Sequence, residues 1–197
     1  MPLLTSLKNH TATAHAALEE QLDIQRHFQS EELYRRLLES FYSLYAPLEE
    51  RLAELIDWNQ KNWDFEIRRK TPWLENDLSN LGMTGNDVAA LSLSNGLPEI
   101  KNLGAAVGCL YVLEGSTLGG QMITKLLQRS LPLTAEKAGA FFAGYREQTG
   151  LRWREFGMWA EALARDDPGM EASAVNAAKD TFDSFALRFK NLNFTNV

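Results

Sequence analysis

Apolar side chains recur at helical spacing along almost the entire chain. Leu7, Ala14, Leu18 and Leu22 share one face of a first predicted helix. Further helices are predicted at 30–58, 71–82 and 84–94, at about 100–130, at 134–164, and from 171 onward. No segment shows the alternation of apolar and polar residues that a half-buried strand would have. The pattern therefore predicts an all-α fold of seven to eight helices.

Residues with special backbone preferences mark the ends of these helices. Ser30 is a predicted N-cap, and Gly82 a predicted C-cap. Pro132 should end the long helix before it, and Pro47 should kink or divide the helix that contains it. The chain has no Gly/Ser/Pro-rich linker and no repeat of fixed period, so we expect a single domain over residues 1–197.

Composition narrows the class of protein. The net charge of -6 and the pI of about 5.2 argue against a general nucleic-acid binder. Cys109 is the single cysteine, so neither an intramolecular disulfide nor a cysteine-rich zinc site is expected. No apolar stretch approaches the roughly 18 residues of a membrane span. The N-terminus lacks the apolar core of a signal peptide, so we expect a cytoplasmic protein without membrane contact.

Glycines form a stripe on the long predicted helix at about 100–130. Gly104, Gly108, Gly115 and Gly119 fall within a sector about 60° wide at roughly 100° per residue. Each glycine inside a helix costs about 1 kcal/mol relative to alanine, so the stripe needs a compensating cause. The pattern alone favours close packing against another helix. The alternative is a flat ligand lying against the backbone, with a bend or a loosened hydrogen-bond ladder at the segment GSTLGG.

A candidate metal ligand lies on the first predicted helix. Lys8, Thr11 and His15 share one face, and Lys8 and His15 are about 10 Å apart along the axis. That distance suits an iron at the centre of a porphyrin and a carboxylate at its edge, because neutral imidazole binds iron and lysine attracts a propionate. A lone helical histidine is more often not a ligand. His10 competes from a different face, and His27 is expected in a solvated loop.

Several segments resemble bacterial haem oxygenases. The segment LYVLEGSTLGGQMI (110–123) resembles the distal-helix motif of that family. LKNHTATAHAALEE (7–20) is similar to the proximal helix, with a threonine four residues before the haem-ligand histidine. FFAGYREQTGLRWREF (141–156) resembles a block of the phytochrome-associated branch, and 74–82 and 177–185 fit more weakly. The resemblance implies a haem oxygenase-like bundle with haem between the proximal and distal helices.

The resemblance also implies roles for individual residues. His15 would be the proximal iron ligand, and the backbone at Gly115 and Gly119 would lie over the distal face of the haem. The other residues that would bind a propionate or line the pocket are Lys8, Tyr111, Gly120, Arg152, Arg154, Phe182 and Phe185.

Ser116 departs from one branch of the family. Mammalian-type members have an aspartate directly after the first distal glycine, where it organises water near bound oxygen. In this chain that position is Ser116. Gly115, Ser116 and Gly119 are therefore the candidate catalytic positions, and the water would be held by Ser116, by backbone carbonyls or by an arginine of 146–154.

In the family, haem is both substrate and cofactor. Its ring is opened to biliverdin with release of carbon monoxide and ferrous iron, and the electrons come from an external donor such as a ferredoxin or a reductase. A bacteriophytochrome is a candidate receiver of the biliverdin. Three alternatives stay open: a non-catalytic haem carrier, a purely structural bundle, and a thiamin-pyrimidine hydrolase that would need Cys109 as nucleophile.

Overall fold

The computed structural model describes residues 1–190 and 192, and no β-strand occurs among them. The helices longer than one turn in this range are α1 (Leu3–Leu22), α3 (Glu31–Leu55), α4 (Thr71–Asn80), α5 (Gly85–Ala89), α6 (Leu103–Ser130), α8 (Thr149–Asp166) and α9 (Met170–Lys190). Short turns link them: α2 (Ile24–His27), α7 (Ala140–Ala143), and the 3-10 turns η1 (Asn59–Lys61), η2 (Glu66–Arg68) and η3 (Arg146–Gln148). The predicted all-α class is confirmed.

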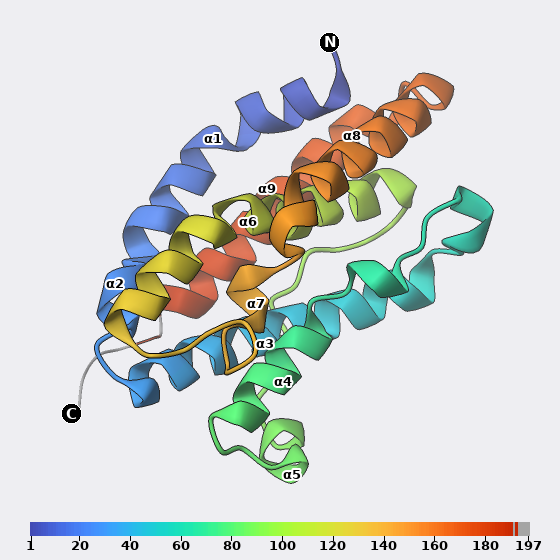
Figure 1. Ribbon diagram of the computed structural model, residues 1–197. Helices are drawn as coiled ribbons and strands as arrows, with labels where there is room; N and C mark the ends of the chain where they lie inside the picture. The colour runs from blue at the N-terminus through green and yellow to red at the C-terminus, as the bar shows by residue number, and fades with distance from the viewer. Residues whose placement is uncertain (191, 193–197) are drawn as a thin grey trace.

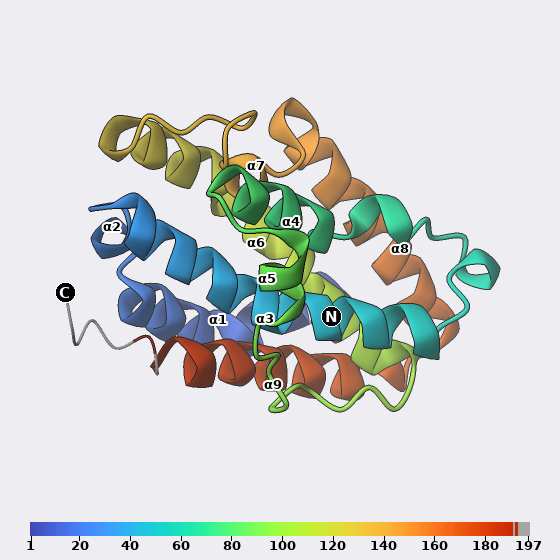
Figure 2. The same cartoon turned by 90° about the horizontal axis from the view of Figure 1, so that it is seen from below.

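Helix α9 is the support on which the predicted site is built. It packs against both α1 and α6, and these two helices run in the same general direction (Figure 1). Helices α3 and α4 pack on each other, as the view from below shows (Figure 2). Aromatic rings fill the space between α3 and α9. The ring centroid of Phe41 on α3 lies 4.9 Å from those of Phe141 on α7 and Phe189 on α9.

The predicted helix ends at Ser30 and Gly82 are confirmed. The Ser30 side chain accepts a hydrogen bond from the Leu33 amide, and Gly82 has a φ of +89° directly after α4. Thr84 and Asp87 form a reciprocal capping box at the start of α5. These helix ends are therefore determined by residues within the same turn of the chain.

Pro47 does not divide α3, which continues from Glu31 to Leu55. Proline has no amide hydrogen, so the carbonyl four residues earlier loses its helical donor. That carbonyl belongs to Ser43, and it accepts a hydrogen bond of 2.8 Å from the amide of Ser94. Ser94, a residue beyond α5, therefore supplies the donor that the Ser43 carbonyl lacks.

The single helix predicted for 134–164 is wrong. The chain forms the short α7, a turn and then α8. Gly144 adopts a φ of +53°, which ends α7. The Asp77 carboxylate on α4 accepts hydrogen bonds from the amides of Ala140 (2.9 Å) and Phe141 (2.8 Å), and so it holds the start of α7. A side chain from another helix therefore competes with the helical pattern of this segment.

Candidate functional site

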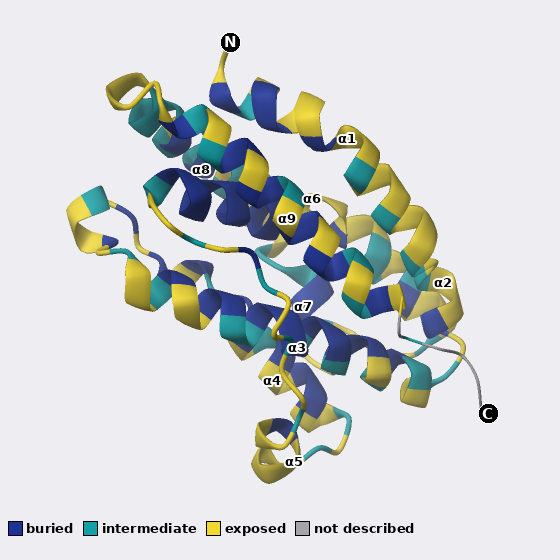
Figure 3. Cartoon of the chain, turned by 180° about the vertical axis from the view of Figure 1, so that it is seen from behind, coloured by how far each residue is buried: buried dark blue, intermediate teal, exposed yellow. Residues whose placement is uncertain are grey.

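The two helices that carry the predicted site leave the core in their second halves. The buried residues of α1 all lie in its first half and are Leu3, Ser6, Leu7 and Thr11. The second half of α1 is exposed along much of its length, as the view by burial shows (Figure 3). Beyond Gly115, the buried residues of α6 are Thr117, Gly120 and Leu127. Space next to both helices is therefore open where the candidate residues are located.

The first two glycines of the stripe are packing residues. A Cβ atom built on Gly108 would lie 2.1 Å from the carbonyl oxygen of Ala174, which is backbone of α9. At Gly104 it would lie 2.9 Å from the carbonyl oxygen of Met170. For this half of α6 the packing interpretation is correct, because only glycine lets the two backbones approach so closely.

The next two glycines, Gly115 and Gly119, have no backbone against them. A Cβ atom on Gly115 would meet only the Trp153 ring, at 3.8 Å, and on Gly119 only the Ile123 side chain of the same helix, at 4.0 Å. The adjacent Met122 side chain is 79% exposed. This glycine pair therefore offers a bare backbone surface with apolar surroundings, which we call the glycine cradle.

The cradle lies on regular helix. Helix α6 remains helical through GSTLGG, so the loosened ladder considered for this segment is not observed. Gly120 points elsewhere: a Cβ atom there would lie 2.1 Å from the carbonyl oxygen of Phe142 in α7. Among the glycines of GSTLGG, Gly120 therefore serves packing, and Gly115 and Gly119 form the open surface.

His15 is an accessible imidazole on α1. Its side chain is 58% exposed, and its ring centroid lies 5.6 Å from that of Phe182 on α9. Its Nε2 atom lies 3.4 Å from the carboxylate of Glu19 on the next turn. The ring can therefore rotate onto a ligand without leaving a buried position, and the buried Phe182 forms the wall beside it.

The other two histidines are placed differently. Nδ1 of His10 lies 2.9 Å from the carbonyl oxygen of Ser6, so this ring is bonded to its own helix. His27 is buried in α2, which corrects the expectation of a solvated loop position. Burial lowers the pKa of His27. Neither histidine combines the exposure and the setting that His15 has.

Tyr111 connects the two helices at the near end of the site. Burial raises the pKa of Tyr111, and the nearby Thr11 side chain of α1 acts on this pKa in the opposite direction. Its ring centroid lies 5.8 Å from that of Trp153 on α8, the residue whose ring meets Gly115. Lys8 is exposed on the same helix as Thr11. Tyr111 is therefore placed next to the cradle, between α1 and α8.

Ser116 is held by a residue that the sequence analysis did not select. Its Oγ atom lies 3.0 Å from the hydroxyl oxygen of Tyr45 on α3, and it donates to the Leu113 carbonyl at 2.8 Å. Because the single Ser116 hydroxyl hydrogen is used for Leu113, Tyr45 donates to Ser116. Burial raises the pKa of Tyr45, which keeps it a neutral donor. In the sequence Tyr45 was indistinguishable from the other apolar positions of its helix.

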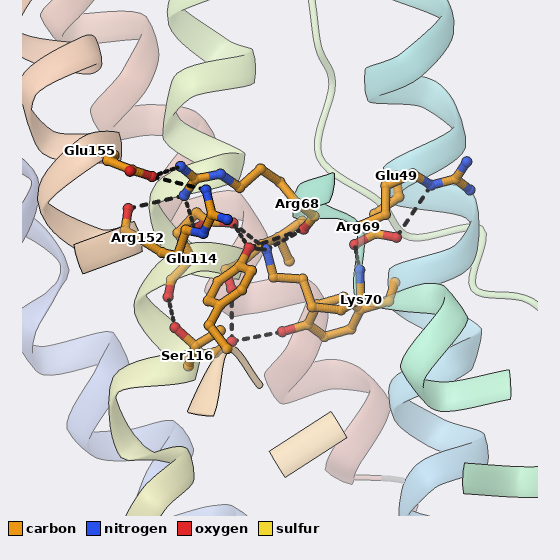
Figure 4. A network of polar contacts seen from close by, with 12 residues as sticks. Glu49, Arg68, Arg69, Lys70, Glu114, Ser116, Arg152 and Glu155 are labelled. Atoms are coloured by element: carbon orange, nitrogen blue, oxygen red, sulfur yellow. Dashed lines mark hydrogen bonds and ion pairs between the residues drawn. The ribbon is translucent and has the colours of Figure 1, made fainter. Parts of the chain in front are cut away.

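Glu114, the residue before Gly115, is fully buried in a charged network (Figure 4). Its carboxylate accepts hydrogen bonds from the Lys70 ammonium group, from Arg68 Nη1 at 3.0 Å and from the Tyr145 hydroxyl at 2.8 Å. Burial and the charge of Glu114 raise the pKa of Tyr145. These contacts fix the rotation of α6 at the cradle, and sequence reasoning did not find them.

Arg152 belongs to the same network. Arg68 Nη2 donates to Glu155 at 2.6 Å, and Arg152 Nη1 donates to the same carboxylate at 3.2 Å. The neighbouring Arg154 is exposed. Between them lies Trp153, which is the residue of this α8 segment that reaches Gly115. The structure thus places Arg152 in an ion-pair network and leaves Arg154 on the surface.

Comparisons with known proteins identify the family and the fold of the chain. The family model described as "Heme oxygenase" matches residues 1–191. A haem oxygenase from Xanthomonas campestris pv. campestris is 30% identical over 153 residues, which are 77% of this chain and 86% of that protein. No helix of residues 1–190 is long and apolar enough to cross a membrane.

Solved structures show the same fold. The NO- and CO-bound haem oxygenase of Neisseria meningitidis has a TM-score of 0.83 at 21% identity, covering 98% of this chain and 92% of that one. Haem oxygenase from Leptospira interrogans has a TM-score of 0.74 at 21% identity, with 96% and 98% covered. Haem oxygenase-1 from Synechocystis, solved in complex with haem, has a TM-score of 0.72 at 19% identity, with 98% and 93% covered. The match over nearly the whole chain, together with the identity to the Xanthomonas protein, shows that this chain belongs to the haem oxygenase family.

Proposed function

We propose that this haem oxygenase opens haem to biliverdin, with release of carbon monoxide and ferrous iron, at the space between α1 and α6. The observation that carries the assignment of this site is the glycine cradle. Gly115 and Gly119 leave a bare backbone where a Cβ atom would meet no other backbone, and His15 offers an exposed imidazole on α1. A flat macrocycle fits such a surface, and the iron at its centre takes a neutral imidazole as ligand.

The residues of the chain have separate tasks in this proposal. Bound haem supplies the iron chemistry that activates oxygen. His15 gives up its contact with Glu19 and holds the iron as a neutral ligand. Gly115 and Gly119 keep the distal backbone close to the ring. The hydroxyl oxygen of Ser116, fixed by Tyr45, accepts a hydrogen bond from a water beside the cradle, and a proton reaches the site through that water.

The propionates and the partners complete the proposal. Lys8 lies two turns before His15 and is exposed, so its ammonium group can meet a propionate, with Tyr111 and Arg154 as further candidates. An external ferredoxin or reductase in the cytoplasm supplies the electrons. The likeness of 141–156 to the phytochrome-associated branch supports a bacteriophytochrome as receiver of the biliverdin.

A hemin titration followed by reduction tests the function. We expect a sharp Soret band that saturates at equimolar hemin, and formation of a bile pigment when ascorbate or a ferredoxin system is added. Absence of the band would exclude the site. A stable complex, or bleaching without a bile pigment, would instead support the carrier alternative.

Two histidine variants test the iron ligand. His15→Ala should abolish the normal axial ligation in the absorption and resonance Raman spectra. His10→Ala is the matched control, because its ring is bonded to its own helix, and it should leave both spectra unchanged. Equal spectra from the two variants would refute the assignment. Gly119→Leu should block hemin binding by filling the cradle, and undiminished affinity would show that the ring lies elsewhere.

A further inference from the structure

A run of aromatic rings leads from the glycine cradle to another surface of the molecule. It begins at Trp153, whose ring edge lies 3.8 Å from the Cβ position of Gly115. The ring centroids of Trp153 and Phe156 are 5.5 Å apart, and those of Phe156 and Trp63 are 6.0 Å apart. Trp63 then stacks on Trp159 at 4.3 Å with an interplanar angle of 21°. Each ring therefore contacts the next, from the predicted haem surface outward.

The run ends at an open groove. Trp159 is half-buried, and with Trp63 it lines a groove of about 500 Å³ between the segment 62–68 and α8. The adjacent Met158 is 75% exposed and lines the same groove. The indole N–H of Trp159 donates to the Lys61 carbonyl at 2.8 Å. Small molecules in solution can therefore approach Trp159.

Tryptophan is concentrated in this run. The chain has five tryptophans, and Trp73 lies apart from the run, against Tyr145 at 5.2 Å. Trp58 is a buried neighbour of the last ring, with its centroid 6.3 Å from that of Trp159. Aromatic packing alone is satisfied by phenylalanine at such contacts. Indole differs from phenylalanine in that it loses an electron far more easily, so its position here has a chemical consequence.

We propose that this aromatic run carries oxidising equivalents away from bound haem to Trp159, which protects the site when peroxide is reduced without ring opening. The inference rests on the proposed haem site, because the run begins at the cradle. It adds an electron-transfer function that ring opening itself does not require.

Charged and polar groups beside the run determine which tryptophan loses an electron most easily. The Arg68 guanidinium lies 4.3 Å from the Trp63 ring centroid, so a positive charge on Trp63 is disfavoured. The Trp159 N–H instead points at a carbonyl oxygen, which favours a positive charge on that indole. The electron is therefore lost, on balance, by Trp159 rather than by Trp63.

The step balances with hydrogen peroxide as the oxidant. The O–O bond of peroxide breaks at the haem, and two electrons and two protons convert it to two molecules of water. Each electron comes from one tryptophan, Trp159 first and Trp153 as the second donor; each indole becomes a cation radical, and the two protons come from the solvent. The tryptophans are oxidised, the peroxide is reduced, and the haem ends in the state in which it began.

The test treats the hemin complex with hydrogen peroxide and locates the oxidised tryptophans by peptide mass spectrometry, with freeze-quench EPR for the indole radical. We expect oxidation mainly at Trp159, and Trp73 should stay intact. In Trp159→Phe, oxidation of Trp153 and the rate of haem bleaching should both rise several-fold. Trp159→Tyr should bleach like the wild type, because tyrosine also gives up an electron, and Trp73→Phe should match the wild type.

Controls separate this inference from direct oxidation and from packing. The exposed Met158 should be oxidised by peroxide even without hemin, whereas Trp159 should not. Equal oxidation of Trp159 with and without hemin, oxidation of Trp73 to the same extent, or equal bleaching of Trp159→Phe and Trp159→Tyr would each overturn the proposal. If hemin binds and a bile pigment forms in those cases, the proposed function stands and this inference alone fails. Failure of hemin to bind would refute both.

Discussion

The two halves of α6 carry the same glycine pattern for different physical reasons. In the first half, Gly104 and Gly108 let the backbone of α9 approach so closely that no Cβ atom would fit. In the second half, Gly115 and Gly119 face no other backbone. The same helical face therefore changes from a packing surface to an open cradle within about two turns. A glycine in a helix is interpretable only when the group opposite it is known.

Glu114 stands at the boundary between the halves, and its removal should have the largest effect on stability. Glu114→Leu leaves the buried ammonium group of Lys70 without its carboxylate, so we expect a loss of about 3–5 kcal/mol in the free energy of unfolding by urea. Glu155→Leu is the matched control. Its carboxylate is 39% exposed, so the loss should be about 1 kcal/mol or less. Equal losses of unfolding free energy in the two variants would mean that the buried ion pairs of Glu114 contribute no more to stability than the exposed ion pair of Glu155.

Gly108→Ala tests the packed half. The new methyl group would lie 2.1 Å from the Ala174 carbonyl oxygen, so α9 must move away. We expect a loss of roughly 2–3 kcal/mol in the free energy of unfolding, as for other overpacked interiors. An unchanged or increased stability would show that α9 is not held against this half of α6.

Gly119→Ala tests the open half and should change stability in the opposite direction. No backbone opposes the new methyl group, and alanine favours the helix, so the free energy of unfolding should rise by up to about 1 kcal/mol. Hemin affinity should fall in the same variant, because the methyl group occupies the cradle. Loss of both stability and affinity would place Gly119 with the packing glycines.

The smallest effect concerns pH and the contact of α4 with α7 through Asp77. Burial raises the pKa of Asp77 from 3.8 to about 6, so the folded state binds this proton more tightly than the unfolded state does. The contribution of Asp77 to stability should therefore fall as the pH rises from 3.8 through about 6. In Asp77→Asn this fall should vanish from the difference between unfolding curves measured at several pH values. A pH dependence that persists in the variant would assign it to other groups.

The sequence revealed those features that have local causes. The caps at Ser30 and Gly82 depend on residues within the same turn, and the spacing of Lys8 and His15 depends on one helix. The division of the glycine stripe was not predictable, because Ala174 lies far from Gly108 in the sequence and no backbone faces Gly119.

The polar residues behind the cradle were hidden for the same reason. Tyr45 meets Ser116 across 71 positions, and Lys70 meets Glu114 across 44. A tyrosine in an apolar stripe and a lysine near a turn carry no sign of such partners. The break before α8 was missed because the Asp77 carboxylate that holds α7 comes from α4. These features depend on contacts between residues far apart in the sequence, which the spacing of apolar residues does not reveal.

The proline within α3 has a consequence for how the chain could be improved. Replacing Pro47 with alanine would restore the amide that the helix lacks and should favour α3 in isolation. The restored amide would, however, compete with Ser94 for the Ser43 carbonyl, and the segment before α6 would lose an attachment. The carbonyl that Pro47 leaves without a helical donor thus holds the loop that leads into α6. Pro47→Ala would therefore favour α3 but weaken the attachment of this loop.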